Sequence, residues 1–144
     1  MNITDAVRIS APIERVWDVY ADVEAWPEWT ASVRSVELLD GRVLAMGARA
    51  RIEQPRFPRV VWTVTALERG ASWTWVARSP GARTTATHAL QRIDDGTTLV
   101  TQAIEQRGVV GTLVGLLARR LTRRYLAMEA AGLRQRVEAH VAST

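Results

Sequence analysis

The chain has 144 residues, of which 47% are hydrophobic and 24% are charged, values that are ordinary for one globular domain. It has no cysteine, which excludes a disulfide, a thiolate nucleophile and a sulfur-ligated metal site. No uncharged apolar run reaches about 18 residues, and no secretory signal pattern opens the chain. We therefore expect a single domain over residues 1–144, located in the cytoplasm.

The formal net charge is +4, and the basic residues are nineteen arginines with no lysine. A basic balance raises the question of nucleic acid or an anionic membrane as a partner. The arginines are scattered along the chain, however, except for a group of four between residues 119 and 124. Complete use of arginine over lysine is typical of a bias in genomic composition, so we expect no nucleic-acid partner.

The first elements are a strand and two short helices. Ile3, Val7 and Ile9 alternate with small or polar residues, which predicts a strand. Pro12 suits the first turn of a helix, and apolar residues follow at the spacing of one helix face, namely Ile13, Val16, Trp17 and Tyr20. Asp22 is expected to cap a second short helix, which should stop at Trp26-Pro27 because proline disfavours helix in the residue before it.

From Val33 onward, apolar and polar residues alternate with period two, and turn signals interrupt the alternation. The turn signals are Asp40-Gly41, which separates a strand ending near Leu39 from one beginning near Val43, and then residues 54–58, 68–70, 79–81 and 94–96. Short turns between consecutive strands predict an antiparallel meander of six strands. The first strand is expected to add a seventh at one edge.

The last apolar stretch, Val109 to Val141, predicts one C-terminal helix of about 30 residues, which would be about 45 Å long. The residues expected on one face of it are Leu113, Leu117, Leu121, Tyr125, Met128 and Gly132. Such a helix is longer than a small domain needs for packing, so we expect a curved sheet wrapped around it. One helix does not fill the concave side of such a sheet, and a cavity should therefore lie between them.

Several short motifs, in this order, resemble those of the START-like (SRPBCC) superfamily and of its polyketide cyclase/dehydrase branch. The motifs are Ala11-Pro12-Ile13-Glu14-Arg15-Val16-Trp17, Asp22, Trp26-Pro27-Glu28-Trp29, Val61-Trp62, Trp73-Thr74-Trp75, His88 with Leu90, and Asp95-Gly96-Thr97-Thr98. The resemblance runs from about Thr4 to His140. It implies an α+β helix-grip fold, in which a seven-stranded antiparallel sheet grips the C-terminal helix around a ligand cavity. Members of the superfamily bind lipids, sterols or hormones, cyclise polyketides, assist co-chaperones or have no known activity, so fold alone does not give function.

Six tryptophans in a chain of this length are well above ordinary usage. Trp73 and Trp75 share one face of a strand by alternation, and only the concave face accommodates two such rings. The rings either fill the core or form an aromatic wall for a flat apolar ligand. The side chains expected to contact a ligand are Trp29, Trp62, Trp73, Trp75, His88, Thr101, Leu121, Tyr125 and Met128.

Acid–base chemistry in the cavity would need a group that titrates near neutral pH, and His88 with Glu105 could supply one. Glu105 faces inward if Leu99, Thr101 and Ala103 do so. The opposite register, with Val100, Gln102 and Ile104 inward, is equally apolar. A buried His88 that is hydrogen-bonded and does nothing else is the alternative. Two distant histidines give no metal spacing, so we expect no metal and no other cofactor.

The start of the C-terminal helix is apolar nearly all round, through Val109, Val110, Leu113, Val114, Leu116 and Leu117, and Arg119, Arg120, Arg123 and Arg124 follow it. This segment could be a gate at the mouth of the cavity, a homodimer contact or a transient contact with an anionic membrane. The arginines could equally form a solvated face.

Three functions remain open on sequence grounds. The first is binding or carriage of a small hydrophobic, aromatic or lipid-like ligand, which a cavity of about 300 Å³ or more, lined by Trp62, Trp75 and Met128, would support. The second is a polyketide cyclase/dehydrase-type enzyme that uses His88. The third is a protein-interaction domain with a vestigial cavity. The small number of titratable groups expected to face inward favours the first over the second.

Overall fold

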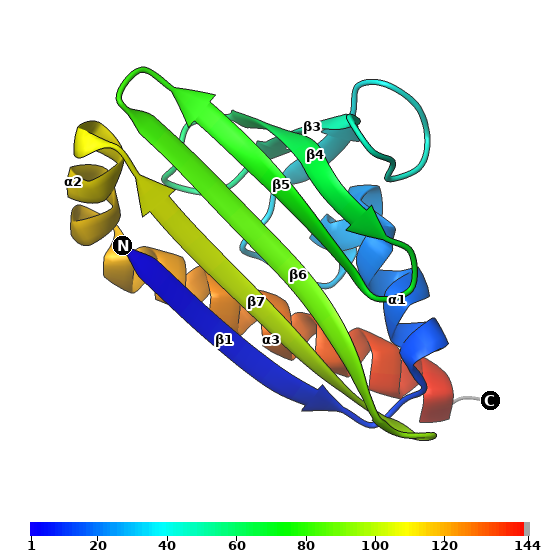
Figure 1. The fold of residues 1–144 in the computed structure, drawn as a ribbon. Helices are drawn as coiled ribbons and strands as arrows, with labels where there is room; N and C mark the ends of the chain where they lie inside the picture. Colours follow the sequence, from blue (N-terminus) through cyan, green and yellow to red (C-terminus); the bar gives the residue numbers. More distant parts are fainter. Residues whose placement is uncertain (143–144) are drawn as a thin grey trace.

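A computed structural model describes the backbone of residues 1–142 and the side chains of residues 1–139. The elements, in chain order, are β1 (Asn2–Ile9), α1 (Ile13–Ala21), the 3-10 helix η1 (Val23–Glu28), β2 (Ser35–Leu38), β3 (Arg49–Glu53), β4 (Val60–Glu68), β5 (Ser72–Ser79), β6 (Ala82–Asp94), β7 (Thr97–Arg107), α2 (Val109–Leu117) and α3 (Arg119–Ala142) (Figure 1).

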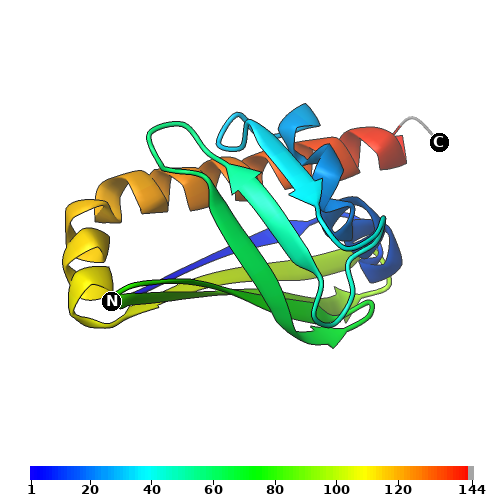
Figure 2. The ribbon, with the colours of Figure 1, turned by 90° about the horizontal axis from the view of Figure 1, so that it is seen from above.

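The seven strands form one antiparallel sheet in the order β1-β7-β6-β5-β4-β3-β2. Strands β2 to β7 therefore form a meander. The last of them, β7, also pairs with β1, which is an edge strand of the sheet. The sheet curves, and α3 runs along its concave side (Figures 1 and 2). This arrangement confirms the predicted α+β fold, with a seven-stranded sheet around a long C-terminal helix and two short helices after the first strand.

Most of the predicted turns lie where strands meet, and the first is the exception. Asp95-Gly96 joins β6 to β7 as a two-residue hairpin turn. By contrast, β3 begins at Arg49 and not near Val43, so residues 39–48 form a loop. Within that loop Leu44 is buried while Val43 is exposed. Leu44, one of the apolar residues whose alternation predicted a strand, therefore packs into the core from a loop.

The predicted single C-terminal helix is two helices, which is a correction. The chain turns at Ala118, where α2 ends and before α3 begins, and Figure 2 shows the two helices with different directions. α2 packs against β6 and β7, whereas α3 packs against β1 and α1. Leu113 and Leu117 are consequently exposed. Between residues 119 and 139 the buried positions of α3 are Tyr125, Leu126, Glu129, Ala130, Leu133 and Val137, which share one helix face. No helix within residues 1–142 combines the length and the apolar character needed to cross a membrane.

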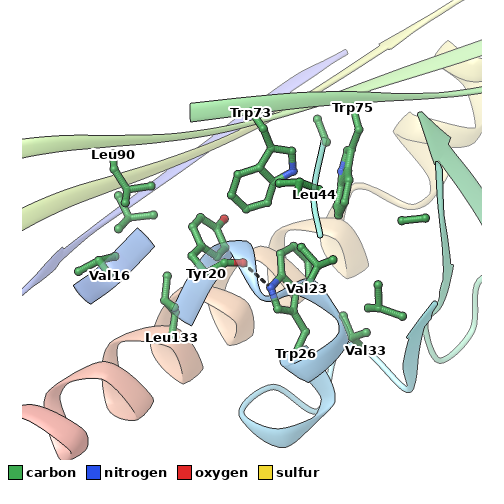
Figure 3. Close-up of a cluster of buried hydrophobic side chains, with 14 of the residues drawn as sticks. Val16, Tyr20, Val23, Trp26, Val33, Leu44, Trp73, Trp75, Leu90 and Leu133 are labelled. Carbon is green, nitrogen blue, oxygen red and sulfur yellow. Dashed lines mark hydrogen bonds between the residues drawn. The ribbon is translucent and has the colours of Figure 1, made fainter. Parts of the chain in front are cut away.

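The core is aromatic at the end of the concave side where α1 and η1 cover the sheet (Figure 3). The ring of Tyr20 lies 4.9 Å from that of Trp73 and stacks on that of Trp26 at 5.7 Å. The indole nitrogen of Trp26 donates a hydrogen bond of 2.8 Å to the carbonyl of Tyr20. Trp26 is 2% exposed and lies inside this core.

Candidate functional site

A cavity of about 240 Å³ lies between the concave side of the sheet and the two C-terminal helices. Its wall comes from strands β3 to β7, from η1, from the loop between β3 and β4, and from both C-terminal helices. The aromatic core fills the remainder of the concave side, which is why the cavity is smaller than the expected 300 Å³. Most of the wall is apolar, as in sites that bind small organic molecules.

The structure brings together four of the nine side chains expected to contact a ligand. Trp62, Trp75, His88 and Tyr125 all lie on the cavity wall. Trp62 and Trp75 stand side by side, with ring centroids 6.0 Å apart and planes at 35°, and so form one aromatic surface. A flat apolar molecule can stack on such a surface.

The other five do not line the cavity. Trp73 is fully buried in the aromatic core. Trp29 is half-buried against Trp26, at a ring distance of 5.7 Å. Leu121 and Met128 are half-buried on α3, away from the wall. Because α3 begins only at Arg119, its buried face is rotated from the one predicted for a continuous helix.

Strand β7 has the second of the two registers that the sequence left open. Val100 and Gln102 are buried on the concave side, and Gln102 lies opposite His88 on β6. Thr101 and Glu105 therefore lie on the other face of the sheet, where Glu105 forms an ion pair with Arg107. The inward orientation on which a His88–Glu105 acid–base pair depended is wrong.

His88 is buried and stacks on Trp73, with ring centroids 4.1 Å apart and planes at 12°. Its Nδ1 lies 3.3 Å from the carbonyl oxygen of Trp73. Burial lowers the pKa of His88 to about 3, so the imidazole is neutral at physiological pH. The stacked ring of Trp73 and one backbone contact hold His88 in place. A ligand in the cavity would therefore meet an uncharged imidazole, not a cation.

The cavity wall also carries a carboxyl group that was not expected there from the sequence, Glu129 of α3. The hydroxyl of Tyr20 donates a hydrogen bond of 3.2 Å to its Oε1. Burial, with a smaller contribution from the charge of Asp5, raises the pKa of Glu129 to about 8, against the lowering effect of the Tyr20 hydrogen bond. Burial and the neighbouring Glu129 likewise raise the pKa of Tyr20 well above its usual value. At neutral pH Glu129 is therefore mostly a protonated, uncharged acid.

The helical spacing contained a signal for Glu129. It lies four residues after Tyr125 and four before Leu133, both of them buried on α3. A carboxylate at this position of an apolar face has to be paired, protonated or functional.

One side of the cavity is bounded by the loop between β3 and β4, which α3 holds in place. The hydroxyl of Tyr125 donates a hydrogen bond to the carbonyl of Pro55, and its ring meets that of Phe57 edge-on at 5.6 Å. Val114 of α2 and Ala118 at the turn between the helices also lie on the wall. The loop and the turn between α2 and α3 therefore frame the cavity from outside the sheet.

Comparison with known proteins agrees with this arrangement. The sequence model of the family described as polyketide cyclase / dehydrase and lipid transport matches residues 1–138. A proposed polyketide cyclase from Streptomyces halstedii is 30% identical over 88 residues, which span 61% of this chain and 70% of that protein.

Solved structures show the same fold at low sequence identity. A START superfamily protein from Mycobacterium smegmatis superposes with a TM-score of 0.73 and 19% identity, over 96% of this chain and 97% of that one. A hypothetical protein from Helicobacter pylori gives a TM-score of 0.79 and 14% identity, over 95% and 88% of the two chains. The START-like helix-grip fold and the family expected from the sequence motifs are both confirmed.

Proposed function

Because this chain belongs to the polyketide cyclase / dehydrase and lipid transport family, we propose that it binds and carries one small hydrophobic or aromatic molecule. The observation that supports this proposal is the apolar cavity of about 240 Å³ between the sheet and the C-terminal helices, with Trp62 and Trp75 as its aromatic surface. The ligand would stack on these two rings and be covered by the loop between β3 and β4.

Cavity size and charge narrow the class of ligand. An apolar cavity of about 150 Å³ accommodates benzene, so 240 Å³ suffices in proportion for roughly 10 non-hydrogen atoms. Among residues 1–139 no arginine lies on the wall, and the acidic residue there, Glu129, is uncharged when protonated. A neutral molecule of the size of naphthalene fits these conditions, whereas an anion would find no cation to pair with.

Naphthalene binding, followed by quenching of tryptophan fluorescence, tests the proposal. Ala86 is buried on the wall, so Ala86→Leu should fill part of the cavity and weaken binding at least about tenfold. Ala89 lies on the same strand, does not line the cavity, and provides the matched control Ala89→Leu, which should bind as the unchanged protein does. Equal binding by the Ala86→Leu variant would contradict a ligand site in this cavity.

A second candidate function, acid–base catalysis of the cyclase or dehydrase kind, is favoured by Glu129. A carboxyl with a pKa of about 8 on the wall of an apolar cavity can protonate a carbonyl oxygen at neutral pH. The hydrogen bond from Tyr20 fixes its position. His88, with a pKa of about 3, is the weaker candidate, because it is a poor base and almost never protonated.

The enzyme hypothesis is tested by turnover of a cyclisable polyketide mimic. General acid catalysis typically contributes about 100-fold or more, so Glu129→Gln should lower turnover by that factor while naphthalene binding is retained. His88→Gln in the same assay measures the role of the imidazole. Unchanged turnover in either variant would remove that residue from the mechanism.

A further inference from the structure

Helix α2 exposes its large apolar side chains in place of burying them. Val109 is 88% exposed and Leu117 is 81% exposed. Four more apolar residues of the helix, Val110, Leu113, Val114 and Leu116, are between 48% and 58% exposed. These six residues, called the α2 surface below, form a contiguous apolar patch of the kind that marks an interaction site.

The opposite side of α2 explains this orientation. The buried residues of the helix are Gly111 and Gly115, one helical turn apart. A Cβ atom at Gly111 would lie 3.2 Å from the Cα of Ala82, and one at Gly115 would lie 2.3 Å from the side-chain oxygen of Gln106. The helix backbone thus packs directly on the ends of β6 and β7 through its glycines. Most of the surface of its large side chains is consequently left to solvent, although Val110 lies beside Gly81 and Val114 reaches the cavity wall.

The charges that follow α2 along the chain are all positive. Arg119, Arg120, Arg123 and Arg124 follow the helix directly, and no acidic residue occurs between Glu105 and Glu129. Arg120, Arg123 and Arg124 are exposed, and within residues 1–139 none of the four takes part in an ion pair. An apolar helix bordered by unpaired arginines is complementary to an anionic lipid surface, into which side chains insert while the arginines contact headgroups.

We propose that the α2 surface, together with these four arginines, docks the protein on an anionic phospholipid membrane. Charge favours this occupant over a second copy of the chain. The arginine group follows the helix, and at its other end Arg83 of β6 lies opposite Arg107, whose own charge is paired with Glu105. Both ends are therefore net positive, so two such helices packed in either direction would place like charges together. The docked face also adjoins the cavity, because Val114 and Ala118 line it. Membrane contact would therefore bring the cavity to the lipid surface.

Co-sedimentation of the full chain with phosphatidylcholine vesicles, with and without 30% phosphatidylglycerol, measures the docking. Binding should require the anionic lipid and weaken at high salt. Replacing two arginines, in the double variant Arg120→Gln and Arg123→Gln, should reduce it by about thirty-fold, since each basic residue near such a surface contributes about fivefold. Leu113→Gln with Leu117→Gln should reduce it at least about tenfold.

Matched controls exist elsewhere on the chain. Arg34 and Arg42 are exposed, so changing both to glutamine removes the same charge at another place. Val43 and Met46 are exposed apolar residues of the loop between β2 and β3, and Val43→Gln with Met46→Gln removes comparable apolar surface. Both control variants should sediment with anionic vesicles as the unchanged protein does.

Three results would overturn docking on lipid, two of them in the sedimentation assay and one in solution. The first two are equal sedimentation with neutral and anionic vesicles, and equal loss in the control variants. The third is a dimer in analytical ultracentrifugation that Leu113→Gln with Leu117→Gln dissociates, which would assign the α2 surface to a second copy. Naphthalene binding is measured without vesicles, so a failure of docking is distinguishable from a failure of the ligand site.

Discussion

Replacing Glu129 with glutamine should change how the free energy of unfolding depends on pH. Burial raises the pKa of Glu129 to about 8 in the folded chain, whereas an unfolded glutamate titrates near about 4.3. Between these values the folded state holds one proton more than the unfolded state. The free energy of unfolding therefore falls by about 1.36 kcal/mol per pH unit as pH rises, or by about 5 kcal/mol in total. Stabilisation by the neutral acid is complete below about pH 4.3 and is lost as pH rises through about 8.

His88 gives the opposite slope over part of this range. Its pKa is about 3 in the folded chain and about 6.5 when unfolded, so the free energy of unfolding rises with pH between these values. From about pH 4.3 to 6.5 the two contributions cancel in the unchanged protein, and a fall is expected only between about pH 6.5 and 8. Because both proteins contain His88, the difference between Glu129→Gln and the unchanged protein isolates Glu129.

Urea unfolding followed by tryptophan fluorescence between about pH 4.5 and 8.5 measures this difference. Glutamine keeps an acceptor for the Tyr20 hydroxyl and cannot ionise, so its stability advantage should grow steadily to several kcal/mol near pH 8. Glu37 is exposed, and Glu37→Gln should show no comparable trend. A Glu129→Gln difference that stays constant with pH would refute the buried, protonated state of this carboxyl.

Three further substitutions test the framework of the site. Thr98→Val removes a fully buried hydroxyl that donates a 2.8 Å hydrogen bond, and should cost about 1–2 kcal/mol in urea unfolding; an unchanged midpoint would mean that this bond contributes nothing. Tyr125→Phe removes the bond to Pro55 and should speed tryptic cleavage of the loop between β3 and β4; equal cleavage would contradict the tether. Gly108→Ala places a Cβ 2.4 Å from the backbone oxygen of Gly81, at a residue whose φ is +90°, and should lower the free energy of unfolding by about 1–3 kcal/mol. Gly96→Ala, at a residue without positive φ, should cost less, and equal losses in the two variants would argue against strain at Gly108.

The meander was predictable because its turns are encoded locally. Gly81 and Asp95-Gly96 favour tight reversals at the two ends of β6, so the order of β5, β6 and β7 followed from the sequence, whereas the same Asp-Gly pair at Asp40-Gly41 lies in a loop. The register of β7 was not predictable, because Leu99 and Ala103 make one face as apolar as Val100 and Ile104 make the other. A tertiary contact accompanies the observed choice. Thr98 is buried, and its hydroxyl donates a hydrogen bond to the carbonyl of Ala11.

The helix break could not be predicted for a similar reason, and the face expected for one continuous helix leaves Glu129 out. No proline or glycine marks Ala118, and apolar periodicity runs through it. The change of direction accompanies the packing of Gly111 and Gly115 on the ends of the sheet, a contact between distant segments. With the break in place, the buried face of α3 rotates to include Glu129 and to leave Met128 half-buried. The local pattern of apolar residues and turns thus predicted the order of strands and helices. Which side chains line the cavity depended on contacts between segments distant in the sequence.

The central claim is that the cavity between the sheet and α3 holds a small neutral aromatic molecule. Intermolecular nuclear Overhauser effects between naphthalene and the protein test it most directly, because they locate the bound molecule. The account predicts contacts to the rings of Trp62 and Trp75 and to the methyl groups of Ile104 and Leu126, all on the cavity wall. Contacts confined to the leucines of α2, or no contacts under saturating naphthalene, would contradict it.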